Sequence, residues 1–366
     1  MGTEVGRWSE LHGQPEIRDL QRGMDFRHPA VRREVFLRFY EFHLRHKSHP
    51  GCVYFLLPDM WGQGDEELRY WIAFLNGNTQ NPVTTHLLLQ AAPEFPSTPA
   101  AFERLQAFFE LQYERLEFDT DRRYHKKPFL QSVRAYVEAC RPHGGQAAFY
   151  RNTTAAGATP QARFELAWRA VRQKLFSFGR LSTWSYLEYL RIAGFDIEPA
   201  DLMLWDMEGS KSHRNGLSKV LGRDDLDWHK STGFDGSYTE EQLEWLERES
   251  HTLLREAQER IQLPDCNFLT MESAFCTFKS WYRPNRRYPN VYVDMLHDRI
   301  TKAERKWDHK LDFFWEARER HLPAALLQEK NSLGGLARKK QNWFRETGQV
   351  IHMDLMWDCF AHDFVP

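Results

Sequence analysis

The densest group of chemically active side chains in the sequence lies between residues 206 and 222. It combines carboxylates, hydroxyls, cations, a histidine and an amide: Asp206, Glu208, Ser210, Lys211, Ser212, His213, Arg214, Asn215, Ser218 and Lys219. Gly209 and Gly216 bracket its densest part, and glycines allow a tight turn whose N–H groups approach a ligand closely. Cations beside such a turn suit phosphate oxygens, and an amide suits a base edge. A solvated connection between two helices explains the same residues equally well. The Gly-Lys-Ser/Thr ending of a Walker loop is missing, so an ordinary nucleotide triphosphatase is not supported.

Two more polar segments occur in the first half of the chain. The amide-rich turn at 76–82 contains Asn78 and Gln80, which could read a base or line a small pocket, although polar turns commonly just join helices. The segment 119–127 surrounds an aromatic residue and a histidine with four cations: Arg122, Arg123, Lys126 and Lys127. Such a pattern suits contacts with a nucleic-acid backbone, and it also suits a charged surface loop.

Glu272, Cys276 and Lys279 are spaced so that they share one face of a helix predicted over 269–282. A carboxylate, a thiol and an amine on one stripe could do chemistry, whereas a half-buried cysteine between surface charges is the simpler explanation. Arg287 and Tyr288 again pair a cation with an aromatic ring.

Three histidines, His43, His46 and His49, are three residues apart. The spacing allows a metal site, but the last of them lies beyond the expected helix end. We therefore interpret them as a surface cluster.

The composition is that of a globular protein with a sizeable core: 366 residues, of which 42% are hydrophobic. The net charge is −2, so contact with nucleic acid is expected at a local patch rather than over the whole surface. Five cysteines without a CxxC pair favour a reducing compartment over a disulfide framework or a zinc ribbon. No apolar run has the length of a membrane span, which predicts a cytoplasmic protein without a membrane partner.

Hydrophobic periodicity predicts a mainly α, multi-helix globular fold with few or no strands. The segment 52–57 could be a strand or a buried helix start. Helices are predicted over 29–47, 66–75, 83–90, 98–118, 164–178, 181–193, 239–261, 269–282, 291–307 and 311–321, with another that starts at Pro199 and delivers Asp206. The small and polar residues of 144–161 predict a linker. This places an N-terminal helical region at 1–150 and a helical catalytic region at 151–366, which could also form one continuous domain.

Three segments together carry a resemblance to a known family. They are Tyr70-Trp71-x4-Asn76-Gly77-Asn78-Thr79-Gln80, then Thr183-Trp184-x-Tyr186-x16-Met203-x2-Asp206-x2-Gly209-Ser210-x-Ser212-His213-Arg214-Asn215-Gly216, and Met271-Glu272-x3-Cys276-x11-Tyr288-x5-Asp294. These segments resemble the phage amino acid:DNA transferases, also called α-glutamyl/putrescinyl thymine pyrophosphorylases. The likeness spans roughly residues 52–300, and its most specific part is the Gly-Ser-x-Ser-His-Arg-Asn-Gly segment.

The resemblance implies a reaction on modified phage DNA. A thymine analogue with a pyrophosphorylated 5-hydroxymethyl group exchanges pyrophosphate for the amine of a free amino acid, such as glycine, or of a polyamine. The resemblance also implies a distant relation to helical DNA glycosylases, which would suit a base flipped out of the duplex. It implies no settled catalytic residues, so the roles below follow from the chemistry.

Pyrophosphate leaves only if its growing charge is neutralised, for which Lys211, His213 and Arg214 are candidates and a divalent metal is a possible aid. No metal ligands are assigned. The amine must lose a proton, with Asp206 as the first choice of base and Glu272 as the second. Arg287 is a candidate for an amino-acid carboxylate.

A flipped base needs aromatic platforms and an amide that reads its edge. Trp184 or Tyr186 could supply the platform and Asn215 the amide, although Trp184 equally suits a place in the core. The other substrate-binding candidates are Ser210, Ser212, Lys279, Tyr288, Asp294, Asn78 and Gln80.

Two alternatives remain open from the residues. One is a helical DNA glycosylase or lyase that acts on a modified base, although no helix–hairpin–helix Gly-x-Gly signature is visible. The other is a non-catalytic DNA-binding protein. For the transferase, the residues are compatible both with direct displacement and with elimination followed by addition.

Overall fold

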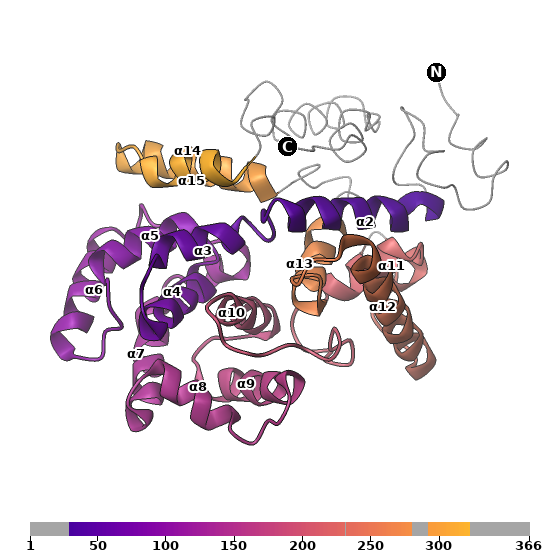
Figure 1. Ribbon diagram of the computed structural model, residues 1–366, viewed down its shortest axis with the longest axis horizontal. Coiled ribbons are helices and arrows are strands. Elements are labelled where there is room, and N and C mark those ends of the chain that lie inside the picture. The colour runs from indigo at the N-terminus through magenta and orange to yellow at the C-terminus, as the bar shows by residue number, and fades with distance from the viewer. Residues whose placement is uncertain (1–28, 231, 280–291, 323–366) are drawn as a thin grey trace.

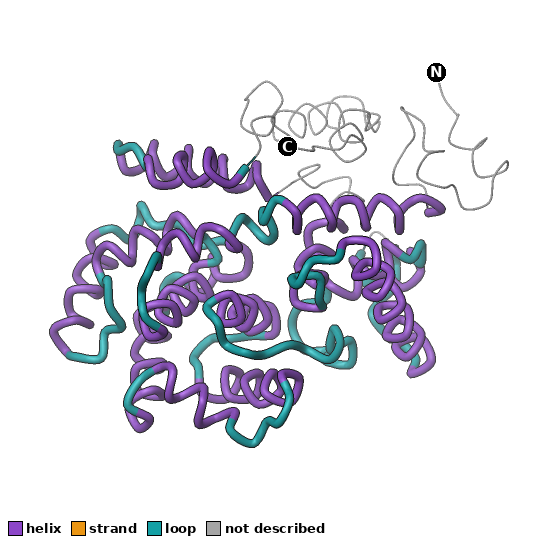
Figure 2. The backbone as a smooth tube through the Cα atoms, in the orientation of Figure 1, coloured by secondary structure: helices purple, strands orange, loops and turns teal. Residues whose placement is uncertain are grey.

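The computed structural model describes residues 29–230, 232–279 and 292–322. Within these ranges the chain forms helices and loops without a strand, which confirms the predicted mainly α fold (Figure 1; Figure 2). The α-helices are α2 (Pro29–Arg45), α3 (Val53–Trp61), α4 (Glu66–Thr79), α5 (Pro82–Ala91), α6 (Pro99–Leu111), α7 (Phe129–Cys140), α8 (Gln146–Thr154), α9 (Pro160–Lys174), α10 (Arg180–Ile192), α11 (Ser212–Val220), α12 (Glu240–Ile261), α13 (Phe268–Phe278), α14 (Tyr292–Trp307) and α15 (Asp312–His321). Short 3-10 helices are η2 (Thr120–His125), η3 (Arg141–His143) and η4 (Asp224–Leu226). None of the described helices combines the length and apolar character that a membrane span requires.

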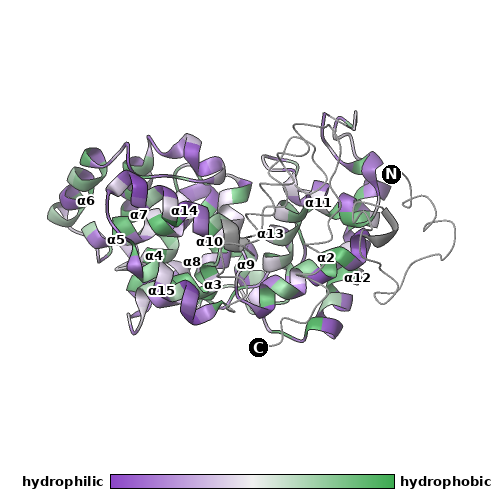
Figure 3. Ribbon diagram, turned by 90° about the horizontal axis from the view of Figure 1, so that it is seen from above, coloured by the Kyte–Doolittle hydropathy of each residue, from purple (hydrophilic) through white to green (hydrophobic). Residues whose placement is uncertain are grey.

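Helix α10 lies at the centre of the fold. It packs against α4, α9 and α3 on one side and against α13 on the other. Seen from above, α2, α11, α12 and α13 form one group, and α4 to α8 form the other (Figure 3). Helix α10 therefore connects the two groups, and the residues it carries lie at their junction.

Local sequence explains where the helices of the junction begin. Thr239 and Gln242 form a capping box at the start of α12, as the sequence predicts. The side chain of Asn267 accepts hydrogen bonds from the first turn of α13. Asn81 caps α5 in the same way, with Pro82 in the first helical position.

Helix α11 approaches α13 closely because it contains Gly216. A Cβ atom at this position would lie 2.5 Å from both the Cβ atom and the carbonyl oxygen of Phe275. The sequence interpretation placed Gly216 at the end of a flexible loop, whereas the structure places it inside a helix that begins at Ser212. The glycine thus serves helix packing rather than a turn.

Several predicted elements differ in the structure. For residues 52–57, where a strand and a buried helix start were both open, the structure shows the helix start: α3 begins at Val53 after its N-cap residue Cys52. The predicted linker at 144–161 contains α8, whose Phe149 and Tyr150 are fully buried, so these residues pack as part of the body. The helix expected from Pro199 is absent, because residues 197–211 run as a loop. The division into two regions at about residue 150 stays a prediction.

Candidate active site

A carboxylate, a guanidinium and an imidazole meet inside the protein where α10, α11 and α13 come together. Nη1 of Arg180 donates a hydrogen bond of 3.0 Å to Oε1 of Glu272. Nδ1 of His213 lies 3.8 Å from the same carboxylate oxygen. The side chains of all three are at most 1% exposed. This Glu272 cluster (Arg180, His213 and Glu272) is a fully desolvated acid–base group of the kind found at catalytic sites.

Each member of the Glu272 cluster is held by its helix. Arg180 is the first residue of α10, and its Nη2 donates to the carbonyl oxygen of Leu202 at 2.8 Å, which ties it to the 197–211 loop. Glu272 lies in the second turn of α13, next to the cap formed by Asn267. The close contact at Gly216 brings His213 toward α13.

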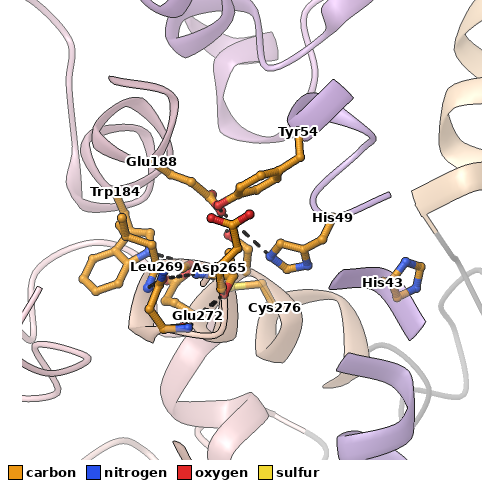
Figure 4. A network of polar contacts seen from close by, with 12 residues as sticks. His43, His49, Tyr54, Trp184, Glu188, Asp265, Leu269, Glu272 and Cys276 are labelled. Atoms are coloured by element: carbon orange, nitrogen blue, oxygen red, sulfur yellow. Dashed lines mark hydrogen bonds and ion pairs between the residues drawn. The ribbon is translucent and has the colours of Figure 1, made fainter. Parts of the chain in front are cut away.

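A second buried carboxylate, Glu188, lies near Glu272 at the same helix junction (Figure 4). Tyr54 and Ser273 donate hydrogen bonds of 3.2 Å to its two oxygens. Nε2 of His49 lies 3.9 Å from Oε1 of Glu188. Burial and the charge of Glu272 raise the pKa of Glu188 well above its usual value. The two carboxylates therefore differ: Glu272 faces a guanidinium, whereas Glu188 faces hydroxyl groups and an imidazole.

The buried histidines favour their neutral forms. Burial, followed by the charges of Arg180, Arg214 and Lys279, lowers the pKa of His213 well below its usual value. Burial also lowers the pKa of His49 to about 3. Neither ring nitrogen of His213 has a hydrogen-bond partner among the described residues, so this imidazole has capacity for a ligand.

The histidine cluster predicted for the surface lies inside instead. His43 and His49 are 0% exposed. Within the described residues, no three His, Cys, Asp or Glu side chains are arranged to hold a metal ion.

A cavity of about 120 Å³ adjoins Glu272. Among the polar or ionisable groups of its wall, besides Glu272, are Gln80, Ser185, Ser273, Cys276 and Arg299. The rest of the wall is formed by Pro50, Gly51, Val53, Pro82, Thr120, Leu181, Tyr189, Thr277 and Met295. The cavity therefore joins α3, α5, α10, α13 and α14 at the carboxylate.

Two residues of the predicted stripe, Glu272 and Cys276, lie on α13, and the third, Lys279, is its C-cap residue. The Cys276 thiol donates to Oε2 of Glu272 at 3.6 Å, and Nζ of Lys279 donates to the carbonyl oxygen of Cys276 at 2.6 Å. Burial and the neighbouring carboxylate raise the pKa of the Cys276 thiol to about 12. The sulfur is therefore a thiol and not a thiolate at neutral pH.

Asp206, the first choice of base, lies in the loop before α11 and away from the Glu272 cluster's hydrogen bonds. Its Oδ2 is 3.6 Å from Nη1 of Arg172, and its Oδ1 accepts from the N–H of Glu208 at 3.0 Å. It also lines a second cavity of about 270 Å³ together with Trp168 and Trp205.

The polar residues from Ser210 onward divide between half-buried and buried positions. Ser210 and Ser212 are half-buried and are joined by a hydrogen bond of 3.3 Å from the Ser212 N–H to the Ser210 hydroxyl. Nζ of Lys211 lies 4.0 Å from the ring centre of Trp228. Arg214 is fully buried, and its Nη1 donates to the carbonyl oxygens of Leu204 and Asp206.

Three predicted base contacts have structural partners instead. The amide of Asn215 donates to the carbonyl oxygen of Trp228 at 3.1 Å and accepts from its N–H at 3.0 Å. The indole of Trp184 is fully buried and donates to the carbonyl oxygen of Leu269 at 3.3 Å. The hydroxyl of Tyr186 is shared with Tyr150 at 2.6 Å. These groups hold the fold around the site, and the expectation that they meet a base directly does not match their packing.

The candidates from the first half of the chain also separate. Arg122 is buried, and it donates to the carbonyl oxygen and the side-chain oxygen of Asn78 at 3.1 and 2.7 Å. Neither group is therefore directed outward, which corrects the expectation that Arg122 contacts a DNA backbone. Gln80 is 6% exposed and lines the 120 Å³ cavity.

The other cations of the 119–127 segment lie nearer the surface. Lys127 and Arg123 are exposed, and Nε of Arg123 donates to the carbonyl oxygen of Thr120 at 2.7 Å. Nζ of Lys126 donates to the carbonyl oxygens of Leu116, at 2.7 Å, and Tyr113. Arg287, Tyr288 and the side chain of Asp294 lie outside the described part of the chain.

Sequence reasoning did not identify Arg180, Glu188 or Arg299, and it assigned His49 to a surface cluster. Each charged residue among them sits in an amphipathic pattern that also suits a solvated helix face. The pairing of opposite charges across long sequence distances would have identified them, but a single sequence does not reveal such pairs.

Comparisons with known proteins give a family and a curated relative for this chain. The family model described as "Amino acid:DNA transferase" matches residues 56–287, a range that includes all three members of the Glu272 cluster. A curated relative, "Serinyltransferase" of Salmonella phage ViI, is 30% identical over 299 residues, which cover 78% of this chain and 72% of that protein. No solved structure gives a significant match.

Proposed function

This chain belongs to the amino acid:DNA transferase family, and we propose that it replaces the pyrophosphate of 5-pyrophosphoryloxymethyl-deoxyuridine in DNA with an amino-acid amine. The enzyme is a transferase that takes part in DNA modification. The observation that carries the finer proposal is the Glu272 cluster, a buried carboxylate beside a neutral imidazole at the edge of a small cavity.

Glu272 is the proton acceptor in this proposal. An amino acid reaches the site as an ammonium ion, and one N–H proton must move to a base before the nitrogen can attack. Arg180 donates a hydrogen bond to Glu272, and the cavity adjoins this residue. We place Asp206 second as a base, because its Oδ2 lies near Arg172 and its Oδ1 accepts a hydrogen bond from the N–H of Glu208 in the same loop.

The group transfer balances as follows. The amine nitrogen forms a bond with the methylene carbon on C5 of the base, and the bond from that carbon to the pyrophosphate oxygen breaks. Pyrophosphate leaves with the electron pair, and the proton taken by Glu272 passes to solvent or to the leaving group. The product is a secondary ammonium group on the base.

Leaving-group charge must be stabilised near this point. Ser210, Lys211 and Ser212 precede or open α11, whose next residue is His213, so they lie within one turn of the Glu272 cluster. We propose that this segment and the unpaired nitrogens of His213 receive the pyrophosphate, with a divalent metal as a possible participant. Arg123, exposed on η2, and Lys127, exposed shortly after η2 ends, are proposed contacts of the DNA backbone.

The test is mass spectrometry of nucleosides digested from DNA that carries 5-pyrophosphoryloxymethyl-deoxyuridine, after incubation with the protein and mixed amino acids. A thymidine adduct with release of pyrophosphate is expected. The Glu272→Gln variant should lose the adduct, and Glu244→Gln, at an exposed side chain of α12, is the matched control. An abasic product would favour a glycosylase instead, and unchanged DNA would leave only a binding role.

A further inference from the structure

We propose that the 120 Å³ cavity beside Glu272 is the acceptor site for a small α-amino acid, with Glu272 facing its ammonium group and Arg299 its carboxylate. The inference rests on the proposed transfer reaction, and it adds the class of acceptor and the residues that select it. An α-amino acid is a zwitterion, and this cavity has one carboxylate and one guanidinium on its wall. Opposite charges at one small site are the complement of such a ligand.

Arg299 is prepared for a carboxylate by the contacts that fix it. Its Nε donates to Oδ2 of Asp119 at 2.5 Å, and its Nη2 donates to the carbonyl oxygen of Gln80 at 3.3 Å. These bonds orient the guanidinium. They leave Nη1 as the nitrogen without a hydrogen-bond acceptor among the described residues. A planar guanidinium held on two sides loses little freedom when a ligand binds the third.

Nη1 of Arg299 also lies over a glycine of the cavity wall. A Cβ atom built on Gly51 would be 2.8 Å from Nη1. Gly51 has a φ of +61°, which few other residues adopt. The residue thus allows the guanidinium to reach the wall of the cavity at a point where any side chain would obstruct it.

Glu272 offers the opposite pole. Oε1 accepts from Arg180, whereas Oε2 accepts only from the Cys276 thiol, a weak donor, within the described part of the chain. Since Cys276 lines the same cavity, Oε2 is the oxygen directed to that side. An ammonium group there would form a charge-assisted hydrogen bond and stand next to its proton acceptor.

The volume of the cavity suits the smallest amino acids. A cavity of about 150 Å³ holds benzene, so 120 Å³ admits about five to seven heavy atoms, the size of glycine or serine. Glutamate and arginine exceed this size. A diamine such as putrescine would place a second cation beside Arg299 instead of a carboxylate.

The experiment compares each amino acid with the amine that lacks its carboxylate: glycine with methylamine, and serine with ethanolamine. Transfer to pyrophosphorylated DNA is measured by nucleoside mass spectrometry for the wild type, Arg299→Gln and Lys302→Gln. Lys302 lies one turn away on α14 and pairs with Glu117, so it is the matched control. Expected is a preference of at least about tenfold for the amino acids in the wild type and in Lys302→Gln, since one charged hydrogen bond contributes about 1.5–3 kcal/mol.

In Arg299→Gln this preference should disappear while ethanolamine and methylamine react as before per folded enzyme. A merely structural role of Arg299 would lower all four rates together and leave the ratio unchanged, which would overturn the proposal. Equal rates with and without the carboxylate in the wild type would overturn it without any variant. In both cases adducts still form, so the transfer reaction itself stands; no adduct with any amine would remove both proposals.

A second variant tests the size limit. Met295 lines the cavity, and Met295→Ala should raise the rates with threonine and valine relative to glycine by several-fold. Efficient transfer of glutamate by the wild type would contradict the cavity as acceptor site.

Discussion

Breaking the Arg180–Glu272 pair separates a structural role from a catalytic one. Three variants are needed: Glu272→Gln, Arg180→Met, and both together. Each single change leaves the other group buried without its partner, because both side chains are at most 1% exposed. The double change removes both charges.

The two roles predict different patterns. Loss of one member of a buried ion pair costs about 3–5 kcal/mol of unfolding free energy, whereas replacement of both is much less costly. We expect each single variant to lose about 3–5 kcal/mol and the double variant to regain most of that loss. Loss of a general base lowers the rate by about 10²–10⁴-fold, and removal of Arg180 does not replace that base. Activity should therefore stay low in both variants that lack Glu272.

Stability is measured by urea denaturation with tryptophan fluorescence, and activity by the nucleoside assay per folded enzyme at a temperature where each variant is folded. The decisive comparison is the double variant, which should be stable and inactive. If stability and activity recover together, Glu272 has only a structural role. Activity of Glu272→Gln within about tenfold of the wild type would equally refute proton acceptance by this carboxylate.

The remaining predictions concern packing, pH and the thiol. Gly216→Ala should lower the free energy of unfolding, measured by urea denaturation, by about 1–3 kcal/mol, because the new Cβ atom would overpack against Phe275 at 2.5 Å. A gain in stability, as helix propensity alone predicts, would contradict the packing. Burial holds the pKa of His49 at about 3, below its ordinary value of 6.5. The unfolded state therefore binds more protons, and His49 removes about 1.4 kcal/mol of stability for each pH unit below 6.5. In His49→Gln, the loss of unfolding free energy per pH unit, measured by urea denaturation between pH 6.5 and about 5, should be smaller by about that amount. An unchanged pH dependence would show that His49 is not buried in its neutral form. Cys276→Ser should keep activity within about threefold, because the thiol is protonated; a loss of more than about 100-fold would indicate covalent attack by sulfur on the base.

Much of the helical framework follows from the sequence alone. Periodic apolar residues and capping signals predicted α10, α12 and α15 to within about two residues, and the capping box at Thr239 formed as expected. The loop at 197–211 did not follow, because Pro199 suits a helix start locally while no later residue of that stretch forms a helical turn. At 144–161 small polar residues indicated a linker, yet Phe149 and Tyr150 anchor that segment in the core.

The site was predictable only in those members that share a local pattern. Glu272 and Cys276 are four residues apart on one helix, and His213 lies in a conspicuous polar segment, so spacing was sufficient to select them. The partner of Glu272 and the guanidinium that lines the cavity come from distant positions in the chain. Arg180 is 92 residues away from Glu272, and Arg299 reaches the cavity from α14. In sequence, an arginine at the start of an amphipathic helix is indistinguishable from one that faces solvent. What makes Arg180 part of the site is its burial beside a carboxylate, and burial is a property of the packed helices.

The converse error has the same origin. Trp184, Tyr186 and Asn215 have the residue types of a base-binding site, but packing directs their polar atoms to Leu269, Tyr150 and Trp228. Residue type thus proposes the chemistry, and only the tertiary contacts decide which polar atoms remain available for a substrate.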